Sequence, residues 1–347
     1  MRTEFHKGAV CYIDLLGFSY LTNLLENKEI YNDGKKEKLL ADKCVKELTL
    51  NDIRALNAYL KFDGDENLLF SNNNDKKTIA EWAYSIVDSN LKKFHEIVER
   101  NCSNYQNVEY VAISDSMFIA SEKSDEILFI LANIFRECIK SGILLRAGLS
   151  YGTYYSVKTH IADFNIYGTA VTNAVSYEKL GKGCRIFTDQ EFPKSSEAFC
   201  QKNPDLFSDY KNYQNYSILD CFEWLMIKDD YVFDEFDTKL FCLSSINPKL
   251  KDLLCDNQLV LYNLLCSPNF EWNLKSSQGY EQMCASVEYV SNLIDKIYDK
   301  FLFEEIKNLE LNLDDGTELL KQTRRSKKVL SNVINSKINE IKNIFEQ

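Results

Sequence analysis

Proline is scarce in this sequence, basic residues are fewer than acidic ones, and long apolar runs are missing from it. Its 347 residues include only 4 prolines, all after residue 190, whereas ten of the 12 glycines come before that point. Such a shift in composition marks a change of architecture, and it predicts a domain boundary near residue 190. Acidic residues outnumber basic ones by 52 to 41. The net charge of -11 argues against nucleic-acid binding, which needs clustered Lys and Arg to neutralise phosphates.

Membrane-targeting segments are also missing. No apolar run approaches the roughly 18 residues that a membrane span needs, and the N-terminal MRTEFHKGAV lacks the apolar stretch of a signal peptide. We therefore expect a cytoplasmic protein without a direct membrane span. The 11 cysteines form no C-x-x-C pair, and those inside apolar runs are expected to be reduced and structural.

Before residue 190, patterns of strands and helices alternate. Strands are predicted over 9–16, 108–120, 143–150 and 184–188, and helices over 79–100 and 125–142. The run at 108–120 is long enough for two strands hinged at Ser114 and Asp115. The order is then β-α-β-β-α-β, which predicts an α+β domain.

Two further regions are expected outside that core. The long interval before the second strand pattern predicts an insertion, roughly residues 25–80, that adds helices. After residue 190 the pattern predicts a mostly helical C-terminal extension over 191–347. Its last helix pattern carries an apolar stripe made of Val329, Val333, Ile334, Ile338, Ile341 and Ile344. The basic cluster at 321–328 is interpreted as solvated surface.

Two aspartates interrupt the apolar strand patterns. Asp14 lies in VCYIDLLGF and Asp115 in EYVAISDSMFIAS. An isolated buried carboxylate costs on the order of several kcal/mol, and a divalent cation shared by both aspartates would compensate them. Each also has an ordinary explanation, since Asp14 can cap a turn and Asp115 can be a simple hairpin-turn residue.

Four motifs together resemble the class III nucleotidyl cyclases, and they occur in that family's order across residues 8–190. They are Asp14-Leu15-Leu16-Gly17-Phe18, Asp115 in ISDSMF, the segment Leu145–Gly152, and the segment Ile166–Glu178. The resemblance implies a ferredoxin-like βαββαβ cyclase core within residues 1–190. It also implies a homodimer with shared active sites and two Mn²⁺ or Mg²⁺ ions per site, held by Asp14, Asp115 and the carbonyl of Leu15.

The same resemblance assigns residues to the triphosphate. Gly17 and Phe18 would offer backbone N–H groups at the start of a helix, where a phosphate is favoured. Arg146 would bind the phosphates through its planar guanidinium group, and with Asp14 and Asp115 it completes the predicted catalytic set. Alternatively, Arg146 forms a buried ion pair with Glu178.

Other positions depart from the common purine-cyclase pattern. Thr172 and Ser176 stand where those enzymes carry an Asn and an Arg, and Val111 and Asn165 stand at the purine-selecting positions. Because an apolar Val111 would leave part of a purine edge unpaired, a smaller base is favoured. Asn165 could read such a base, and Tyr110 or a neighbouring tyrosine could stack on it, although core packing explains the tyrosines equally well. Four basic side chains are candidates to replace the Arg that Ser176 lacks: Lys158, Lys179, Lys182 and Arg185.

This combination is similar to the bacterial pyrimidine cyclases of Pycsar antiphage defence. The resemblance implies conversion of UTP or CTP to the 3′,5′-cyclic monophosphate and pyrophosphate, as a signal to a separate effector protein. The active site would then join two subunits. One would contribute Asp14, Asp115 and Arg146, and the other would contribute Val111, Asn165 and Thr172. Two rival hypotheses remain, a purine (adenylate or guanylate) cyclase and a catalytically degenerate cyclase-like module that binds nucleotide or merely dimerises.

Overall fold

The structure is a computed structural model that describes residues 2–18, 30–32, 35–37, 79–158, 165–189, 191–195, 208–211, 217–220, 258–267, 277–295, 298 and 313–345. Its elements are β1 (Arg2–Leu15), β2 (Ile30–Asn32), β3 (Lys35–Glu37), α4 (Ile79–Cys102), β4 (Val108–Ile113), β5 (Ser116–Ser121), α5 (Ser124–Lys140), β6 (Leu145–Lys158), β7 (Asn165–Tyr167), α6 (Thr169–Leu180), β8 (Ile186–Thr188), α7 (Phe192–Ser195), β9 (Ser208–Lys211), β10 (Ser217–Asp220), α11 (Ser277–Asp295) and α13 (Leu313–Phe345). A further helical segment covers residues 258–265.

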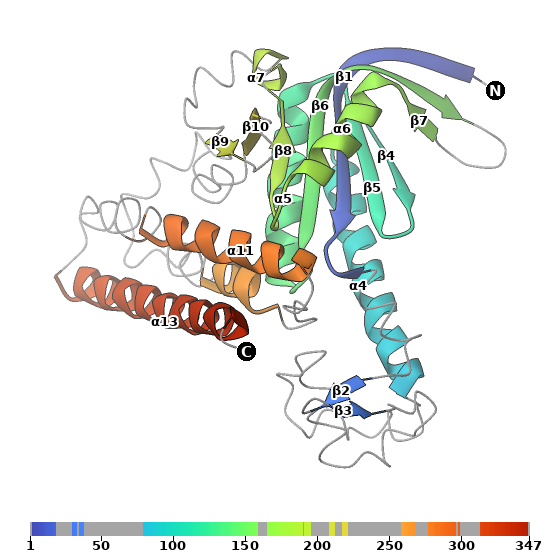
Figure 1. Cartoon of the computed structure of the whole chain (residues 1–347). Coiled ribbons are helices and arrows are strands. Elements are labelled where there is room, and N and C mark those ends of the chain that lie inside the picture. Colours follow the sequence, from blue (N-terminus) through green and yellow to red (C-terminus); the bar gives the residue numbers. More distant parts are fainter. Residues whose placement is uncertain are drawn as a thin grey trace.

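The centre of the fold is an antiparallel sheet in the spatial order β4-β5-β1-β6, with α4 and α5 as crossovers (Figure 1). This arrangement confirms the predicted α+β fold with βαββαβ order. The hinge predicted at Ser114 and Asp115 is the turn between β4 and β5. β1 begins at Arg2 rather than at residue 9, because its first half pairs with the second half of the long strand β6.

β6 has strand neighbours on both of its edges. One edge pairs along its whole length with β1. On the other edge, β8 runs parallel to residues 147–149 and β7 runs antiparallel to residues 155–157. β10 and β9 continue the sheet beyond β8, so strands from beyond residue 190 belong to the same sheet as the core.

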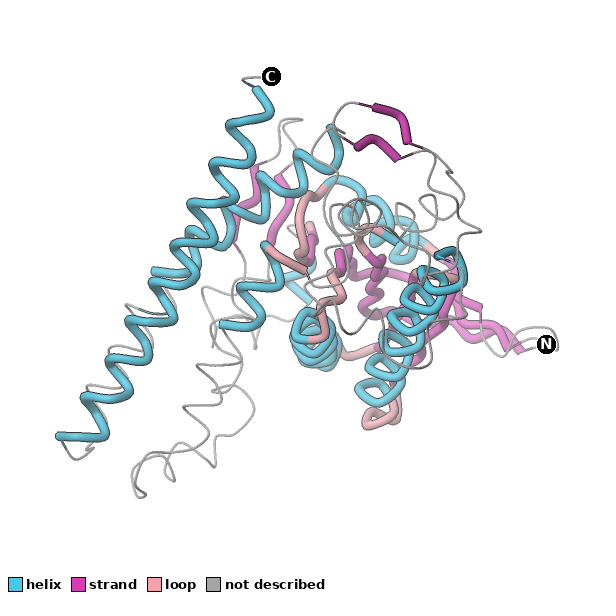
Figure 2. The backbone as a smooth tube through the Cα atoms, turned by 90° about the horizontal axis from the view of Figure 1, so that it is seen from below, coloured by secondary structure: helices cyan, strands magenta, loops and turns pink. Residues whose placement is uncertain are grey.

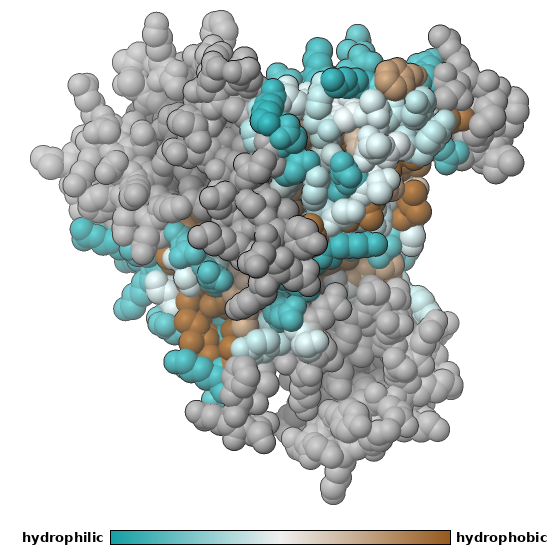
Figure 3. Space-filling view, turned by 45° about the horizontal axis from the view of Figure 1, so that its top comes forward, coloured by the Kyte–Doolittle hydropathy of each residue, from teal (hydrophilic) through white to brown (hydrophobic). Residues whose placement is uncertain are grey.

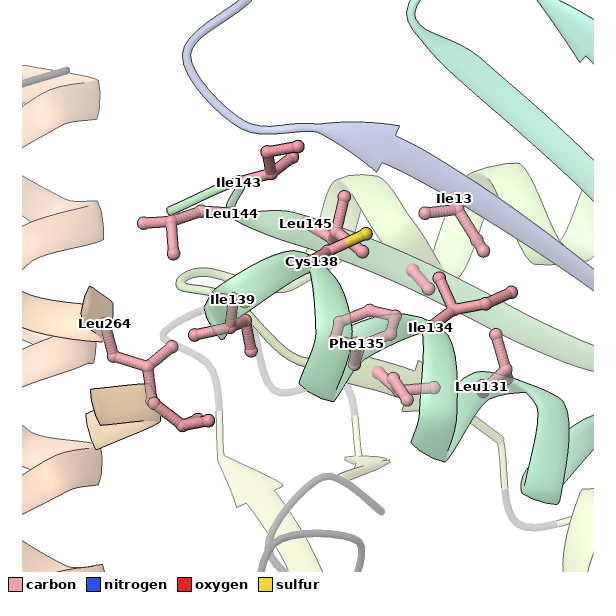
Figure 4. Close-up of a cluster of buried hydrophobic side chains, with 14 of the residues drawn as sticks. Ile13, Leu131, Ile134, Phe135, Cys138, Ile139, Ile143, Leu144, Leu145 and Leu264 are labelled. Carbon is pink, nitrogen blue, oxygen red and sulfur yellow. The ribbon is translucent and has the colours of Figure 1, made fainter. Parts of the chain in front are cut away.

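Alternation along the strands separates two apolar faces. Ala9, Cys11 and Ile13 of β1 are fully buried in one cluster with the apolar sides of α4 and α5. Figure 4 shows Ile13 in that cluster, and Leu264 from the 258–265 helix belongs to it as well. The opposite face is smaller, and there Val10 packs in a second cluster with two alanines of α6, Ala170 and Ala174.

The predicted insertion and extension are described in part. In the insertion, β2 and β3 form a two-stranded hairpin, and the helices expected over the rest of 25–80 lie outside the described residues except for the start of α4. In the extension, α13 packs against α11 and lies on the opposite side of the molecule from the N-terminal end of β1 (Figures 1 and 2). Helices α11 and α13 agree with the predicted mostly helical character, although β9 and β10 add strands.

The described surface carries mostly hydrophilic side chains on the face shown in Figure 3. Large apolar side chains that remain exposed are scattered over several elements; they are Phe5, Tyr84, Ile113, Tyr167, Leu259 and Val329. Within the described helices, none combines the length and the apolar character that crossing a bilayer demands.

Four cysteines are buried in the described core: Cys11, Cys102, Cys138 and Cys184. Burial raises the pKa of the Cys11 and Cys138 thiols well above the ordinary value. Both thiols therefore stay protonated and pack as small apolar groups.

Candidate active site

The candidate site lies at the end of β1, in the centre of the sheet. Asp14 pairs in register with Ser116 on β5 and with Arg146 on β6. Tyr12, two residues earlier, packs against the cluster on the α6 face. Because residues two apart on a strand share a face, Asp14 points to the same side of the sheet as α6.

The β4–β5 turn brings the second aspartate to this end of the sheet. Ile113 pairs with Ser116, so Ser114 and Asp115 form a two-residue turn. The backbone N–H of Leu15 donates to the carbonyl of Asp115 at 3.2 Å, which ties the turn to the end of β1. Ser114 has a φ of 59°, an uncommon value for a residue other than glycine. The structure therefore brings the backbone of Asp115 against Leu15, next to Asp14 at the end of β1.

Asp14 belongs to a hydrogen-bond chain that the sequence does not reveal. The Ser116 hydroxyl donates to Asp14 Oδ1 at 3.1 Å. The Tyr12 hydroxyl lies 2.9 Å from the same Ser116 oxygen, and since Ser116 has given its one proton to Asp14, Tyr12 is the donor in that contact. The only trace of this chain in the sequence is the alternation that puts Tyr12 and Asp14 on one face of a strand.

The carboxyl group of Asp14 stands in an unfavourable environment for negative charge. Burial raises its pKa most, followed by the charge of Glu178 and then that of Asp115, while the Ser116 hydrogen bond and Arg146 lower it. The result is a pKa of about 6 instead of the usual 3.8. A cation bound beside Asp14 would relieve this accumulation of negative charge.

Arg146 lies across from Asp14 and is almost fully buried. Its Nε donates to Glu178 Oε1 on α6 at 2.6 Å, and its Nη2 also pairs with that oxygen. Nη1 donates to the carbonyl of Gly181 at 3.4 Å. The ion pair with Glu178, considered above as the alternative for Arg146, is thus present. A guanidinium group has five N–H groups, and these contacts with the described residues engage three of them.

The donor set fits a hard divalent cation. Two carboxylates, Asp14 and Asp115, stand beside the main chain of Leu15, and oxygen donors of this kind suit Mg²⁺ and Mn²⁺. Among the described residues, no group of three or more His, Cys, Asp or Glu side chains forms a cluster able to hold a metal. Any cation here would therefore depend on two side chains, with main-chain and substrate oxygens completing its coordination.

Gly17 and Phe18, the residues predicted to contact the triphosphate, follow β1 after Leu16. Gly17 has a φ of 79°, a left-handed conformation that glycine adopts without steric cost, and it turns the chain away from the sheet. Phe18 packs partly buried against the cluster on the α4 and α5 face. The helix expected after Phe18 lies outside the described residues.

The base-facing candidates do not all share one face of the sheet. Val111 packs with the cluster on the α6 face, whereas Tyr110 packs with the α4 and α5 cluster on the opposite face. Asn165 on β7 is exposed. Two α6 hydroxyls are engaged by their own helix: Thr172 donates to the Gly168 carbonyl at 3.2 Å and Ser176 to the Thr172 carbonyl at 2.9 Å.

Two of the basic side chains considered as replacements for the missing Arg contact the C-terminal extension. Lys182 pairs with Glu281 of α11 at 3.1 Å. Arg185 is 8% exposed, its Nη2 donates to the carbonyl of Ala285 at 3.1 Å, and its guanidinium lies 4.1 Å from the ring centre of Tyr289. Lys179 is exposed on α6, and nothing is described for the side chain of Lys158.

Neither the protein-family models nor the curated proteins give a match to the sequence. Similar solved structures include the adenylyl cyclase CyaB from P. aeruginosa, at 10% identity and a TM-score of 0.37, over 63% of this chain and 95% of that one. A bacterial light-regulated adenylyl cyclase has 15% identity and a TM-score of 0.38, over 63% of this chain and 52% of that one. The guanylyl cyclase Cya2 has 10% identity and a TM-score of 0.37, over 63% and 93%. Function is therefore inferred below from the residues of this chain.

Proposed function

We propose that this protein is a nucleotide cyclase that converts a nucleoside triphosphate to its 3′,5′-cyclic monophosphate and pyrophosphate. The observation that supports this most is the meeting of Asp14, Asp115 and Arg146 at one end of the sheet, tied by the hydrogen bond from Leu15 to the Asp115 carbonyl. Two carboxylates and a guanidinium group at one place provide what cyclisation of a triphosphate requires, a seat for cations and a partner for phosphate.

In this reaction the 3′ oxygen of the ribose bonds to the α-phosphorus, and the bond from that phosphorus to the oxygen that bridges to the β-phosphate breaks. The 3′ proton passes to solvent or a nearby base, and pyrophosphate leaves. Mn²⁺ or Mg²⁺, two per site, would supply Lewis acidity and neutralise phosphate charge when bound. Asp14, Asp115 and the Leu15 carbonyl would hold them. Arg146 would orient the β- and γ-phosphates, aided by the backbone of Gly17 and Phe18.

We further propose that the substrate is a pyrimidine nucleotide, UTP or CTP. Val111, which packs with apolar side chains, offers no hydrogen bond to a purine edge. Asn165 is exposed and free to present its carbonyl or its amide to a smaller base. Thr172 would face the ribose, and Ser176 would lie near it, each able to exchange its helical hydrogen bond for one to substrate.

Two wider properties belong to the same proposal. The active sites would be shared in a homodimer, with Asp14, Asp115 and Arg146 of one subunit facing Val111, Asn165 and Thr172 of the other. The cyclic product would act on a separate effector protein in antiphage defence, within the cytoplasm. Both properties rest on the motif resemblance and on the departures at Thr172 and Ser176.

The test is incubation of the purified protein with ATP, GTP, CTP and UTP in separate reactions with Mn²⁺, followed by chromatographic identification of products. We expect cyclic UMP or cyclic CMP, and we expect Asp115→Asn to lower its formation by about a hundredfold, since residues that merely support metal ligands already cost about 10- to 100-fold when mutated. Asp88→Asn is the matched control, because Asp88 is an exposed aspartate of α4 paired only with Lys92 among its described contacts.

The same assay separates the rival functions. Cyclic AMP or cyclic GMP as the main product would replace the pyrimidine proposal with a purine cyclase. A degenerate cyclase-like module is favoured by one observation, the burial of Arg146 in its pair with Glu178. It would be indicated by the absence of product from all four nucleotides, together with nucleotide binding that Asp115→Asn leaves unchanged.

A further inference from the structure

The loop of residues 181–185, between α6 and β8, is hydrogen-bonded to the candidate site. The carbonyl of Gly181 accepts from Nη1 of Arg146 at 3.4 Å. The carbonyl of Arg185 accepts from the backbone N–H of Ala147 at 2.9 Å. Two consecutive residues of β6 are therefore held by the two ends of this loop. A shift of the loop would move the Gly181 carbonyl, which is one of the hydrogen-bond partners of the Arg146 guanidinium group.

The other side of the loop is held by α11 of the C-terminal extension. The backbone N–H of Gly183 donates to Oε1 of Gln282. Arg185 donates to the Ala285 carbonyl at 3.1 Å and stacks on Tyr289. These contacts are buried, since Gln282 is 1% exposed, Arg185 8% and Tyr289 4%. Gly183 has a φ of 83°, so the loop reaches α11 in a conformation that suits glycine.

Gln282 is more than a packing residue in this contact. Its Oε1 accepts the Gly183 hydrogen bond, whereas its buried Nε2 has no hydrogen-bond partner among the described residues. Burying an amide whose N–H groups are unpaired is unfavourable, so packing alone does not account for a glutamine at this place. What the amide provides in return is a fixed place for the Gly183 N–H, and with it for the loop.

We propose that Gln282 is a positioning residue for Arg146, through which α11 of the C-terminal extension sets the affinity of the site for the triphosphate. The path runs from Gln282 to Gly183, along the loop to Gly181, and from its carbonyl to Nη1 of Arg146. This inference rests on the proposed function, in which Arg146 binds the phosphates. It assigns the extension a role in that binding.

Gln282→Leu tests the proposal, because leucine fills similar space without an acceptor. The probe is inorganic tripolyphosphate with Mn²⁺, whose binding to the full chain is measured by calorimetry and needs no turnover. We expect the dissociation constant to increase about five- to tenfold, which corresponds to the loss of one hydrogen bond. Gln282→Glu keeps an acceptor for Gly183 and is expected to stay within about twofold of the unmodified protein.

The matched control is Gln258→Leu. Gln258 accepts a hydrogen bond from Ser326 of α13 at 2.7 Å, so the same substitution removes a side-chain hydrogen bond of the extension that does not involve the loop. We expect it to leave tripolyphosphate binding unchanged. Equal weakening by Gln258→Leu and Gln282→Leu would mean that the extension acts through general stability, and it would overturn the proposal.

A double-mutant cycle decides whether Gln282 acts through Arg146. Arg146→Lys keeps a positive charge beside Glu178 while removing the guanidinium fork. In that background Gln282→Leu is expected to weaken binding by less than about twofold, because the group it positions is gone. Full additivity would refute the proposal. A wild-type protein that binds tripolyphosphate as described but forms no cyclic nucleotide would contradict the proposed function while leaving the positioning role intact.

Discussion

Asp14, proposed above as a cation ligand, carries a charge that the metal-free fold does not favour. It holds a central position in the sheet, accepts a hydrogen bond from Ser116 and faces both Glu178 and Asp115. Its apolar sequence context is what reveals it in the sequence. Its neighbours Ser116 and Tyr12 cannot be inferred in the same way, because their contact spans 104 residues and depends on the β1–β5 register.

The raised pKa of Asp14 gives a pH-dependent expectation for the metal-free protein. Its folded-state pKa of about 6 lies above the usual 3.8. Between these two pH values the folded protein therefore holds a proton on Asp14 that the unfolded chain has released. Stability from this group is therefore present at low pH and is lost as pH rises through about 6. Because Asn is never charged, we expect Asp14→Asn to raise the free energy of unfolding at about pH 7.5 by about 1–2 kcal/mol, after allowance for partial exposure.

Urea unfolding with a metal chelator present, at about pH 5 and about pH 7.5, measures this effect. We expect the gain from Asp14→Asn to be clearly smaller at the lower pH. Asp88→Asn, on the exposed surface of α4, controls for the removal of one negative charge. A gain of the same size at both pH values would show that the charge of Asp14 is not the cause.

Arg146 marks a limit of residue-level inference. The sequence places a guanidinium group in an apolar strand, which admits both a phosphate ligand and an ion pair with Glu178. The structure has the ion pair. A phosphate would therefore bind to the two N–H groups of Arg146 that these contacts do not engage.

At the scale of elements, the approach of α6 to β6 is set by a glycine. A Cβ atom at Gly148 would lie 1.8 Å from the Ala174 carbonyl oxygen and 2.6 Å from the Glu178 backbone nitrogen. Both are main-chain atoms of α6, so the helix itself would have to move. This helix also carries Thr172 and Ser176, so its distance from the strand affects every site residue on it.

We expect Gly148→Ala to destabilise the protein by about 3 kcal/mol and to displace Glu178 from Arg146. Gly152→Ala on the same strand is the control, because its nearest contacts, to Thr169 and Ala170, begin at 3.4 Å. We expect that substitution to cost less than about 1 kcal/mol. Thermal unfolding of the two variants measures the difference, and similar melting temperatures would contradict the close packing of α6.

Elements were easier to infer from the sequence than their exact phase or length. The hairpin at Ser114 and Asp115 follows from two apolar runs joined by two polar residues, and it is confirmed. The stripe predicted on the last helix includes Val329. Val329 is 42% exposed, however, and the adjacent Leu330 is fully buried. A helical period fixes the spacing of a stripe, but the partner helix fixes which neighbour faces it.

At the scale of the whole molecule, the core and the extension share one apolar interior. Val260, Leu264 and Met283 belong to the same buried cluster as Ile13 and Phe135. β10 and β9 also extend the sheet past β8. The change in proline and glycine content near residue 190 predicts a domain boundary there, and the described sheet and apolar packing continue across that point.

A chain that ends at residue 190 is therefore expected to lack cooperative unfolding or to aggregate, since it would expose the edge of β8 and the surface that packs against the extension. Co-expression of residues 191–347 as a separate chain is expected to restore solubility by covering that surface. Size-exclusion chromatography with thermal unfolding measures both outcomes. A monodisperse fragment 1–190 that unfolds cooperatively would establish it as an independent domain.

The buried thiols of Cys11 and Cys138 offer a chemical probe of how often the core opens. Cys11 lies on β1, three residues before Asp14, and Cys138 lies on α5 in the same cluster. Because both are fully buried and have raised pKa values, a thiol reagent can modify them only after the sheet separates from α5. The rate of their alkylation thus reports how often the strand that carries Asp14 opens. A ligand bound at the end of that strand would register as slower labelling in the interior.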